Sequence, residues 1–85
     1  MKKMLHVIRA EYLEGFRIVL EFSDGFSGVV DLSGRLTGPI FRPLNDCDEF
    51  KRFAIVGHTL SWTNGADMAP EYLREIAVEI KEAIR

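Results

Sequence analysis

The sequence predicts one α+β domain: about three N-terminal antiparallel strands, a short helix, a second hairpin, and a C-terminal helix packed on the sheet. Three observations predict it. Large apolar residues occupy every second position over residues 16–22, a Gly-His pair separates two β-prone runs, and apolar residues recur at helical spacing after Pro70. Eighty-five residues suffice for one hydrophobic core, so residues 1–85 are expected to form a single domain.

The first strand is predicted over residues 4–10, which are rich in β-forming residues but alternate imperfectly. The second strand is predicted over residues 16–22, where every other residue is a large apolar one. The residues sharing that face are Phe16, Ile18, Leu20 and Phe22. A period of two places such residues on one side of a sheet, so this side is expected to face the core.

The turn at Ser23-Asp24-Gly25 determines how the third strand, residues 26–31, pairs with the second. A two-residue loop would pair Phe22 with Ser27 and turn Phe26 away from the core face. A three-residue loop, with Gly25 in the left-handed region, keeps the apolar side chains together, and we therefore predict it. The predicted pairs are Phe22 with Phe26, Ile18 with Val30, and Arg17 with Asp31.

Residues 32–45 hold several Gly and Pro turn signals between isolated apolar residues, which predicts an ordered loop anchored in the core. Its expected anchors are Leu32, Leu36, Ile40, Phe41 and Leu44. Asp46, followed three residues later by Glu49, resembles a capping box, and Phe50 and Phe53 share a helical face. A short helix is therefore predicted after the loop.

A second hairpin is predicted where residues 53–56 and 59–62 flank Gly57-His58, a pair suited to a tight turn. Pro70 fits the first position of the last helix. The apolar stripe expected to cover the sheet consists of Leu73, Ile76, Ala77, Ile80 and Ile84. The other face of this helix is charged, and Glu82 and Arg85 are spaced as an i, i+3 pair.

The composition, 47% apolar and 28% charged, excludes intrinsic disorder. A net charge of −2 gives no overall basic character, so direct nucleic-acid binding is not expected. No apolar run approaches the roughly 20 residues of a membrane span, and no signal-peptide core follows Met1. The single cysteine, Cys47, cannot form an internal disulfide. We therefore expect a cytoplasmic protein without a membrane association.

The loop from Trp62 to Glu71 contains the densest group of residues suited to chemistry, and two interpretations are open. In the structural one, Asn64 and Gly65 form a turn, and Asp67 caps the last helix because the alanine before its proline is a poor N-cap. In the functional one, a polar notch beside Trp62 uses Asp67 as a general base or ligand anchor. We favour the structural interpretation, because caps are much commoner than catalytic carboxylates. The candidate binding residues are Trp62, Asn64, Gly65, Asp67 and Glu71.

No metal or cofactor site is expected from the sequence. His6, Cys47 and His58 lie far apart along the chain and lack the spacing of common metal ligands. No Gly-x-Ser-x-Gly motif marks a nucleophile, and no Gly-rich loop marks a phosphate site. No catalytic residue is therefore assigned.

Several motifs resemble, in order, the small bacterial domain-of-unknown-function family 2442 over residues 7–73. They are Phe22-Ser-Asp-Gly25, Val30-Asp31-Leu32, Phe41-Arg-Pro-Leu44, Phe50 and Trp62-Thr-Asn-Gly-Ala-Asp-Met-Ala-Pro70. Thr63 departs from the family pattern, which often has proline there. The resemblance implies an α+β domain, β-rich in its N-terminal part and closed by a helix, with no established catalytic residue.

The resemblance also implies that stand-alone members lie beside another small uncharacterised gene, as in toxin–antitoxin or regulatory pairs. Our leading hypothesis is therefore a non-enzymatic interaction module of such a pair, with a small protein encoded by the neighbouring gene as its partner. Formation of a homo-oligomer is left open. The alternative is a small-ligand-binding protein or minor enzyme with its site in the loop from Trp62 to Glu71.

Overall fold

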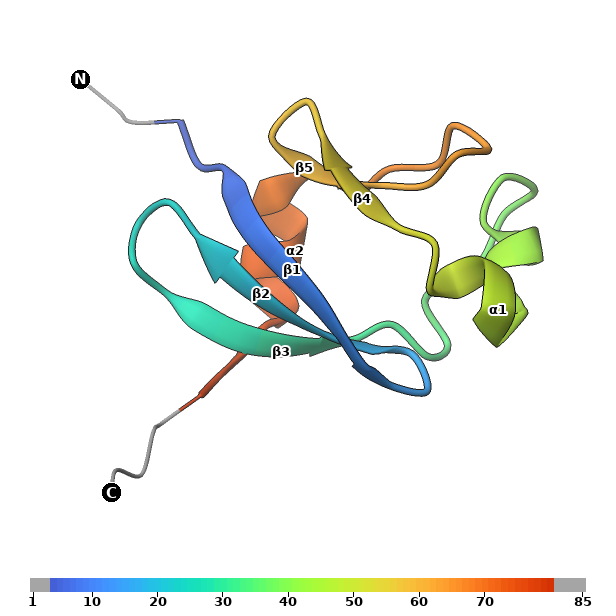
Figure 1. Cartoon of the computed structure of the whole chain (residues 1–85), viewed down its shortest axis with the longest axis horizontal. Coiled ribbons are helices and arrows are strands. Elements are labelled where there is room, and N and C mark those ends of the chain that lie inside the picture. The colour runs from blue at the N-terminus through green and yellow to red at the C-terminus, as the bar shows by residue number, and fades with distance from the viewer. Residues whose placement is uncertain (1–3, 81–85) are drawn as a thin grey trace.

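A computed structural model describes residues 4–80 of the chain (Figure 1). In chain order its elements are β1 (Val7–Glu14), β2 (Arg17–Phe22), β3 (Ser27–Asp31), the 3₁₀ helix η1 (Arg42–Asn45), α1 (Cys47–Phe50), β4 (Ala54–Val56), β5 (Thr59–Ser61), α2 (Pro70–Ile76) and β6 (Val78–Glu79). The predicted α+β class and the predicted order of N-terminal strands, short helix, second hairpin and C-terminal helix are confirmed. No helix within residues 4–80 is long and apolar enough to cross a membrane.

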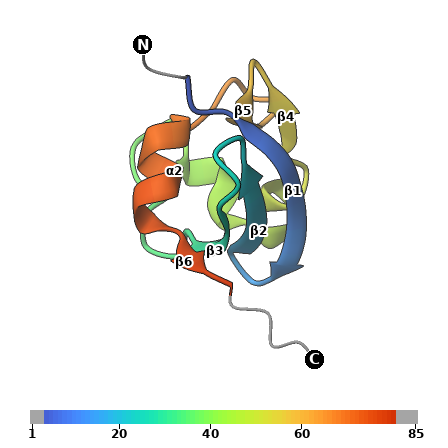
Figure 2. The ribbon, with the colours of Figure 1, turned by 90° about the vertical axis from the view of Figure 1, so that its left-hand side faces the viewer.

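Two antiparallel sheets organise these elements. One has four strands in the order β1-β2-β3-β6, and the other is the hairpin β4-β5. Figure 2 shows α2 lying along one side of the larger sheet and the hairpin standing near the beginning of β1. The backbone N–H of Val7 donates to the carbonyl of His58 at 2.9 Å, which ties the start of β1 to the tip of the hairpin.

The predicted register of β2 and β3 is confirmed. Arg17 pairs with Asp31 and Ile18 with Val30. The N–H of Phe22 donates to the carbonyl of Phe26 at 2.9 Å, closing a three-residue loop. Gly25 in this loop has a φ of 90°, a conformation that costs little only for glycine. Turn chemistry and apolar alternation therefore agree on one register.

The first strand begins and ends later than predicted, at Val7 and Glu14 instead of residues 4–10. Its pairing with β2 shifts register between Val7 and Arg9 and again between Tyr12 and Glu14. Each irregularity interrupts the period of two, since an extra residue on one strand faces a single residue on the other. The imperfect alternation is therefore the signature of a bulged strand and not of a strand end.

The hydrophobic core lies on the inner face of the four-stranded sheet. It is closed by α2, α1 and the loop of residues 32–45. The completely buried large side chains are Val7, Ile18, Leu20, Phe22, Val30, Leu32, Phe50, Leu60 and Leu73. Leu36 and Leu44 are also buried, so the loop is anchored as expected, but Ile40 remains 44% exposed. The predicted core face of β2 is confirmed.

The short helix and the second hairpin also form where the sequence predicts them. Asp46 caps α1, its carboxylate accepting from the N–H of Asp48 at 3.0 Å. In the hairpin, Val56 pairs with Thr59 across the turn. Gly57 and His58 both have positive φ, 63° and 71°, as in the type I′ turns that suit the twist of paired strands.

The last helix is much shorter than predicted. It ends at Ile76, and the chain continues as β6, whose Val78 pairs with Val29 of β3. The N–H of Ile80 donates to the carbonyl of Ser27 at 3.0 Å. Pairing with β6 satisfies backbone N–H and C=O groups at the edge of β3. These hydrogen bonds to a distant strand outweigh the local preference for helix that the apolar spacing indicates. Ile80 therefore does not extend the helical stripe.

The remaining predictions for the last helix are only partly covered by the structure. Leu73 is buried, and Ile76 and Ala77 pack partly against the core. Ile84 and the Glu82–Arg85 pair lie outside the described residues.

Candidate functional site

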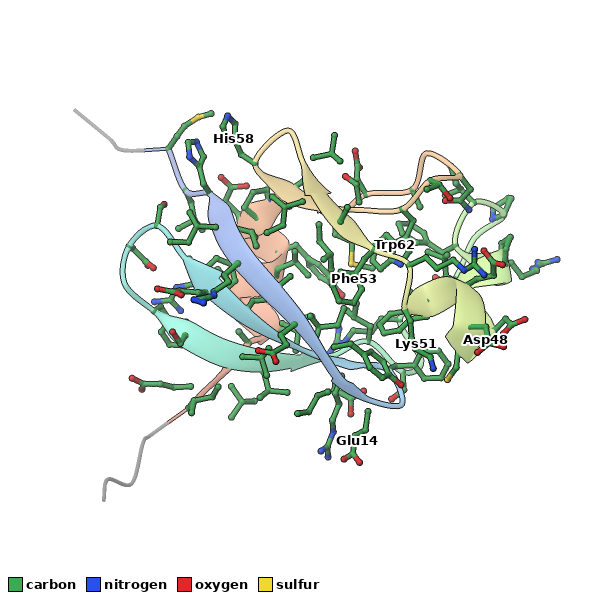
Figure 3. The ribbon with its side chains drawn as sticks, in the orientation of Figure 1. Glu14, Asp48, Lys51, Phe53, His58 and Trp62 are labelled. Carbon is green, nitrogen blue, oxygen red and sulfur yellow. The ribbon has the colours of Figure 1, made fainter. Side chains whose placement is uncertain are left out.

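Trp62, the largest side chain of the candidate loop, belongs to the core. It is 5% exposed, and its indole Nε1–H donates to the carbonyl of Phe50 at 2.9 Å. The two rings lie with their centroids 5.8 Å apart. Figure 3 shows Trp62 directed between the β4-β5 hairpin and α1. Its polar atom is therefore committed to holding α1 and is not presented to a ligand.

Asn64 and Gly65 form the turn that the structural interpretation predicts. The Asn64 Oδ1 accepts from the N–H of Ala66 at 3.1 Å, and its Nδ2 donates to the carbonyl of Ile40 at 2.9 Å. Gly65 has a φ of 94°, a conformation that glycine adopts without strain, which explains why a glycine occupies this position. Asn64 thus ties this turn to the loop of residues 32–45.

Asp67 does not cap α2, so that prediction is wrong. The N-cap position is Ala69, which makes no side-chain cap hydrogen bond. Asp67 pairs through its backbone with Ser61, and within residues 4–80 no hydrogen bond is found to its carboxylate. Backbone pairing holds this residue in an extended segment instead of at the helix end. Its exposed carboxylate and that of Glu71 are both solvated.

The structure therefore brings the five candidate residues into one segment but not into one polar notch. Trp62 points inward, and Asn64 is bound to the neighbouring loop. Two hollows on the described surface are lined by other residues. Their role in binding stays a prediction.

Two histidines that are distant in sequence lie together. The rings of His6 and His58 stack with centroids 4.1 Å apart and an interplanar angle of 13° (Figure 3 labels His58). Ring nitrogens in parallel planes do not converge on one metal ion. No group of three or more metal-ligating side chains occurs in the described part of the chain. The contact follows from the hairpin tip meeting β1, which the spacing of the histidines could not reveal.

A hollow of about 490 Å³ lies elsewhere, on the outer face of the four-stranded sheet, bounded by β1, β3 and β6 and by the last residue of α2. Its lining residues are Leu13, Arg17, Val29, Asp31, Arg35, Ile76 and Val78. The sequence analysis did not identify this site. The sequence did contain one indication of it: Val19 of β2 and Val29 of β3 are apolar residues on the strand faces that point away from the core, and both are only half-buried.

The charges at this hollow form a connected group. The Nη1 of Arg17 lies 3.1 Å from a carboxylate oxygen of Glu14, and its Nε lies 3.8 Å from Asp31. Hydrogen bonds from the N–H and hydroxyl of Ser33 lower the pKa of Asp31, and the guanidinium charges of Arg17 and Arg35 add to this effect. Asp31 is thus an anion held in place. Figure 3 shows Glu14 at the opposite end of β1 from His58.

Comparisons with known proteins agree with the resemblance stated above. A family model described as "Protein of unknown function (DUF2442)" matches residues 7–79. No curated protein and no solved structure matches the sequence. The comparisons thus identify relatives by family without supplying an activity, a substrate or a partner.

Proposed function

The chain belongs to the DUF2442 family, and from this premise we propose that it is a non-enzymatic module that binds a second protein. In this proposal it acts in the bacterial cytoplasm as half of a regulatory or toxin–antitoxin-like pair. The partner is a small protein encoded by the neighbouring gene. The exposed apolar surface on the outer face of the four-stranded sheet is the observation that supports binding.

This surface combines side chains from three separate strands. Leu13 of β1 is 47% exposed and Val78 of β6 is 70% exposed, with the half-buried Val29 of β3 also lining the hollow. Single exposed apolar residues are common on protein surfaces, whereas a group gathered around one hollow is typical of a binding site. The inner face of the same sheet already carries the core, so this group serves no internal packing of comparable extent.

Co-expression with the neighbouring gene product tests the proposal. We expect a stoichiometric complex in size-exclusion chromatography with light scattering. Val78→Asp should weaken the complex about tenfold or more, because a charge would replace an apolar contact. Val56→Asp is the matched control, since Val56 is 61% exposed but belongs to β4.

Circular dichroism would establish that both variants retain the fold. Failure of the wild-type protein to form any complex would contradict the proposed function. Equal loss of binding in Val78→Asp and Val56→Asp would show that the outer face of the four-stranded sheet is not the specific binding surface.

A further inference from the structure

Four of the seven residues that line the outer hollow are apolar, and they come from four elements. They are Leu13 of β1, Val29 of β3, Val78 of β6 and Ile76 at the end of α2. A hollow of about 490 Å³ lies within the range of small-ligand sites, roughly 300 to 1,000 Å³. Such walls favour an occupant with an apolar side chain, because burial of that side chain removes apolar area from water on both partners.

Two guanidinium groups and one carboxylate line the same hollow: Arg17, Arg35 and Asp31. These groups are not equivalent. Arg17 lies within ion-pairing distance of both Asp31 and Glu14, so its charge is compensated within the fold. Asp31 is held by Arg17 and by hydrogen bonds from Ser33. With Glu14 counted beside Arg17, the two guanidinium groups and two carboxylates at the hollow sum to zero. Among residues 4–80, Arg35 is the one of these guanidinium groups that forms no ion pair.

Arg35 is oriented by an uncharged partner. Its Nη1 donates to the hydroxyl of Tyr72 on α2 at 2.9 Å, and this acceptor is uncharged. Among residues 4–80, no carboxylate oxygen lies within 4.0 Å of the Arg35 guanidinium. A guanidinium presents five donors in a planar fork that matches a carboxylate, and one bond to Tyr72 leaves other donors free.

We propose that this hollow receives a segment of the partner protein in which an apolar side chain lies next to a carboxylate. The apolar side chain occupies the walls formed by Leu13, Val29 and Val78, and the carboxylate pairs with Arg35. This assignment rests on the proposed function.

The chemistry of the hollow is tested on the whole protein with N-acetyl-L-leucine, which carries one apolar side chain and one carboxylate. We expect saturable chemical-shift changes in the amide signals of Val29, Asp31 and Val78, with affinity in the millimolar range. N-acetyl-L-leucinamide, which lacks the charge, should bind about tenfold more weakly.

Arg35→Gln should weaken N-acetyl-L-leucine binding about tenfold, because it removes the charge and keeps a polar side chain. Arg52→Gln is the matched control: Arg52 is also exposed but does not line the hollow. Absence of saturable binding, equal binding of the acid and the amide, or an equal effect of the two substitutions would overturn the proposal.

The complex with the neighbouring gene product provides the second measurement. Arg35→Gln should weaken it, and Arg52→Gln should not. A wild-type complex that Arg35→Gln leaves intact would refute this docking site while the proposed function stands. Binding of N-acetyl-L-leucine without any protein complex would refute the partner assignment and leave a site for small organic acids.

Discussion

Adding one methyl group at Gly28 tests whether β6 is held against β3 as closely as the structure indicates. The φ of Gly28 is not in the left-handed region, so its backbone conformation is open to other residues. The space around Gly28, however, is too small for a Cβ atom. A Cβ there would lie 2.8 Å from the carbonyl oxygen of Val78 and 2.9 Å from the Cε2 of Phe26. Both distances are shorter than normal contacts, so β6 must move if alanine is present.

The expected cost of Gly28→Ala combines opposing effects. Overpacking in a well-packed region costs about 1 to 3 kcal/mol. Displacement of β6 also weakens the hydrogen bond from Ile80 to Ser27, and one such bond contributes about 0.5 to 1.5 kcal/mol. Alanine restricts the unfolded chain, which offsets about 0.4 to 1 kcal/mol. We therefore expect a net loss of about 1 to 3 kcal/mol in the free energy of unfolding.

Urea denaturation followed by circular dichroism measures this loss, and hydrogen exchange of the Ile80 amide locates it. Ser27→Ala is the control, because Ser27 neighbours Gly28 in β3 and its replacement adds no atom. We expect the control to change stability by less than about 0.5 kcal/mol. A Gly28→Ala protein of unchanged stability, with the Ile80 amide still protected, would refute the close approach of β6.

Three further predictions concern turns and charges. Gly25→Ala should lower the free energy of unfolding by about 1 kcal/mol or more, since a β-carbon is strained at its positive φ; thermal unfolding with no loss would contradict this. Asn64→Ala should lower the free energy of unfolding by about 1 kcal/mol through two lost hydrogen bonds, whereas Asp67→Ala should change it by less than about 0.5 kcal/mol. Urea denaturation of the two variants measures this difference, and a larger loss for Asp67→Ala would refute it. A hydrogen bond from the backbone N–H of Phe26 and pairing with Arg74 lower the pKa of Asp24 below its ordinary 3.8, so the stability it contributes is present above that pH and is lost as pH falls through the lowered pKa. Asp24→Asn should therefore reduce the fall in stability between about pH 5 and 2, and an unchanged acid denaturation profile would contradict this assignment.

The sequence alone was sufficient for the features that depend on neighbouring residues. Alternation along β2 and the glycine at position 25 predict the β2-β3 register, because a slip of one residue would turn every side chain to the wrong face. The Gly57-His58 pair predicts the second hairpin, and Asp46 predicts the start of α1, since turn and cap chemistry act within a few residues.

Tertiary structure decided the features that depend on distant partners. Residues after Ile76 have helical spacing, yet they pair with β3, because edge groups of a strand some fifty positions earlier gain hydrogen bonds by this pairing. The same crossing places Val78 beside Leu13 and Arg35 and so creates the outer hollow. Local periodicity contains no information about which surfaces meet, and this is why the sequence analysis placed its candidate residues in the loop from Trp62 to Glu71 and did not identify the hollow beside β6.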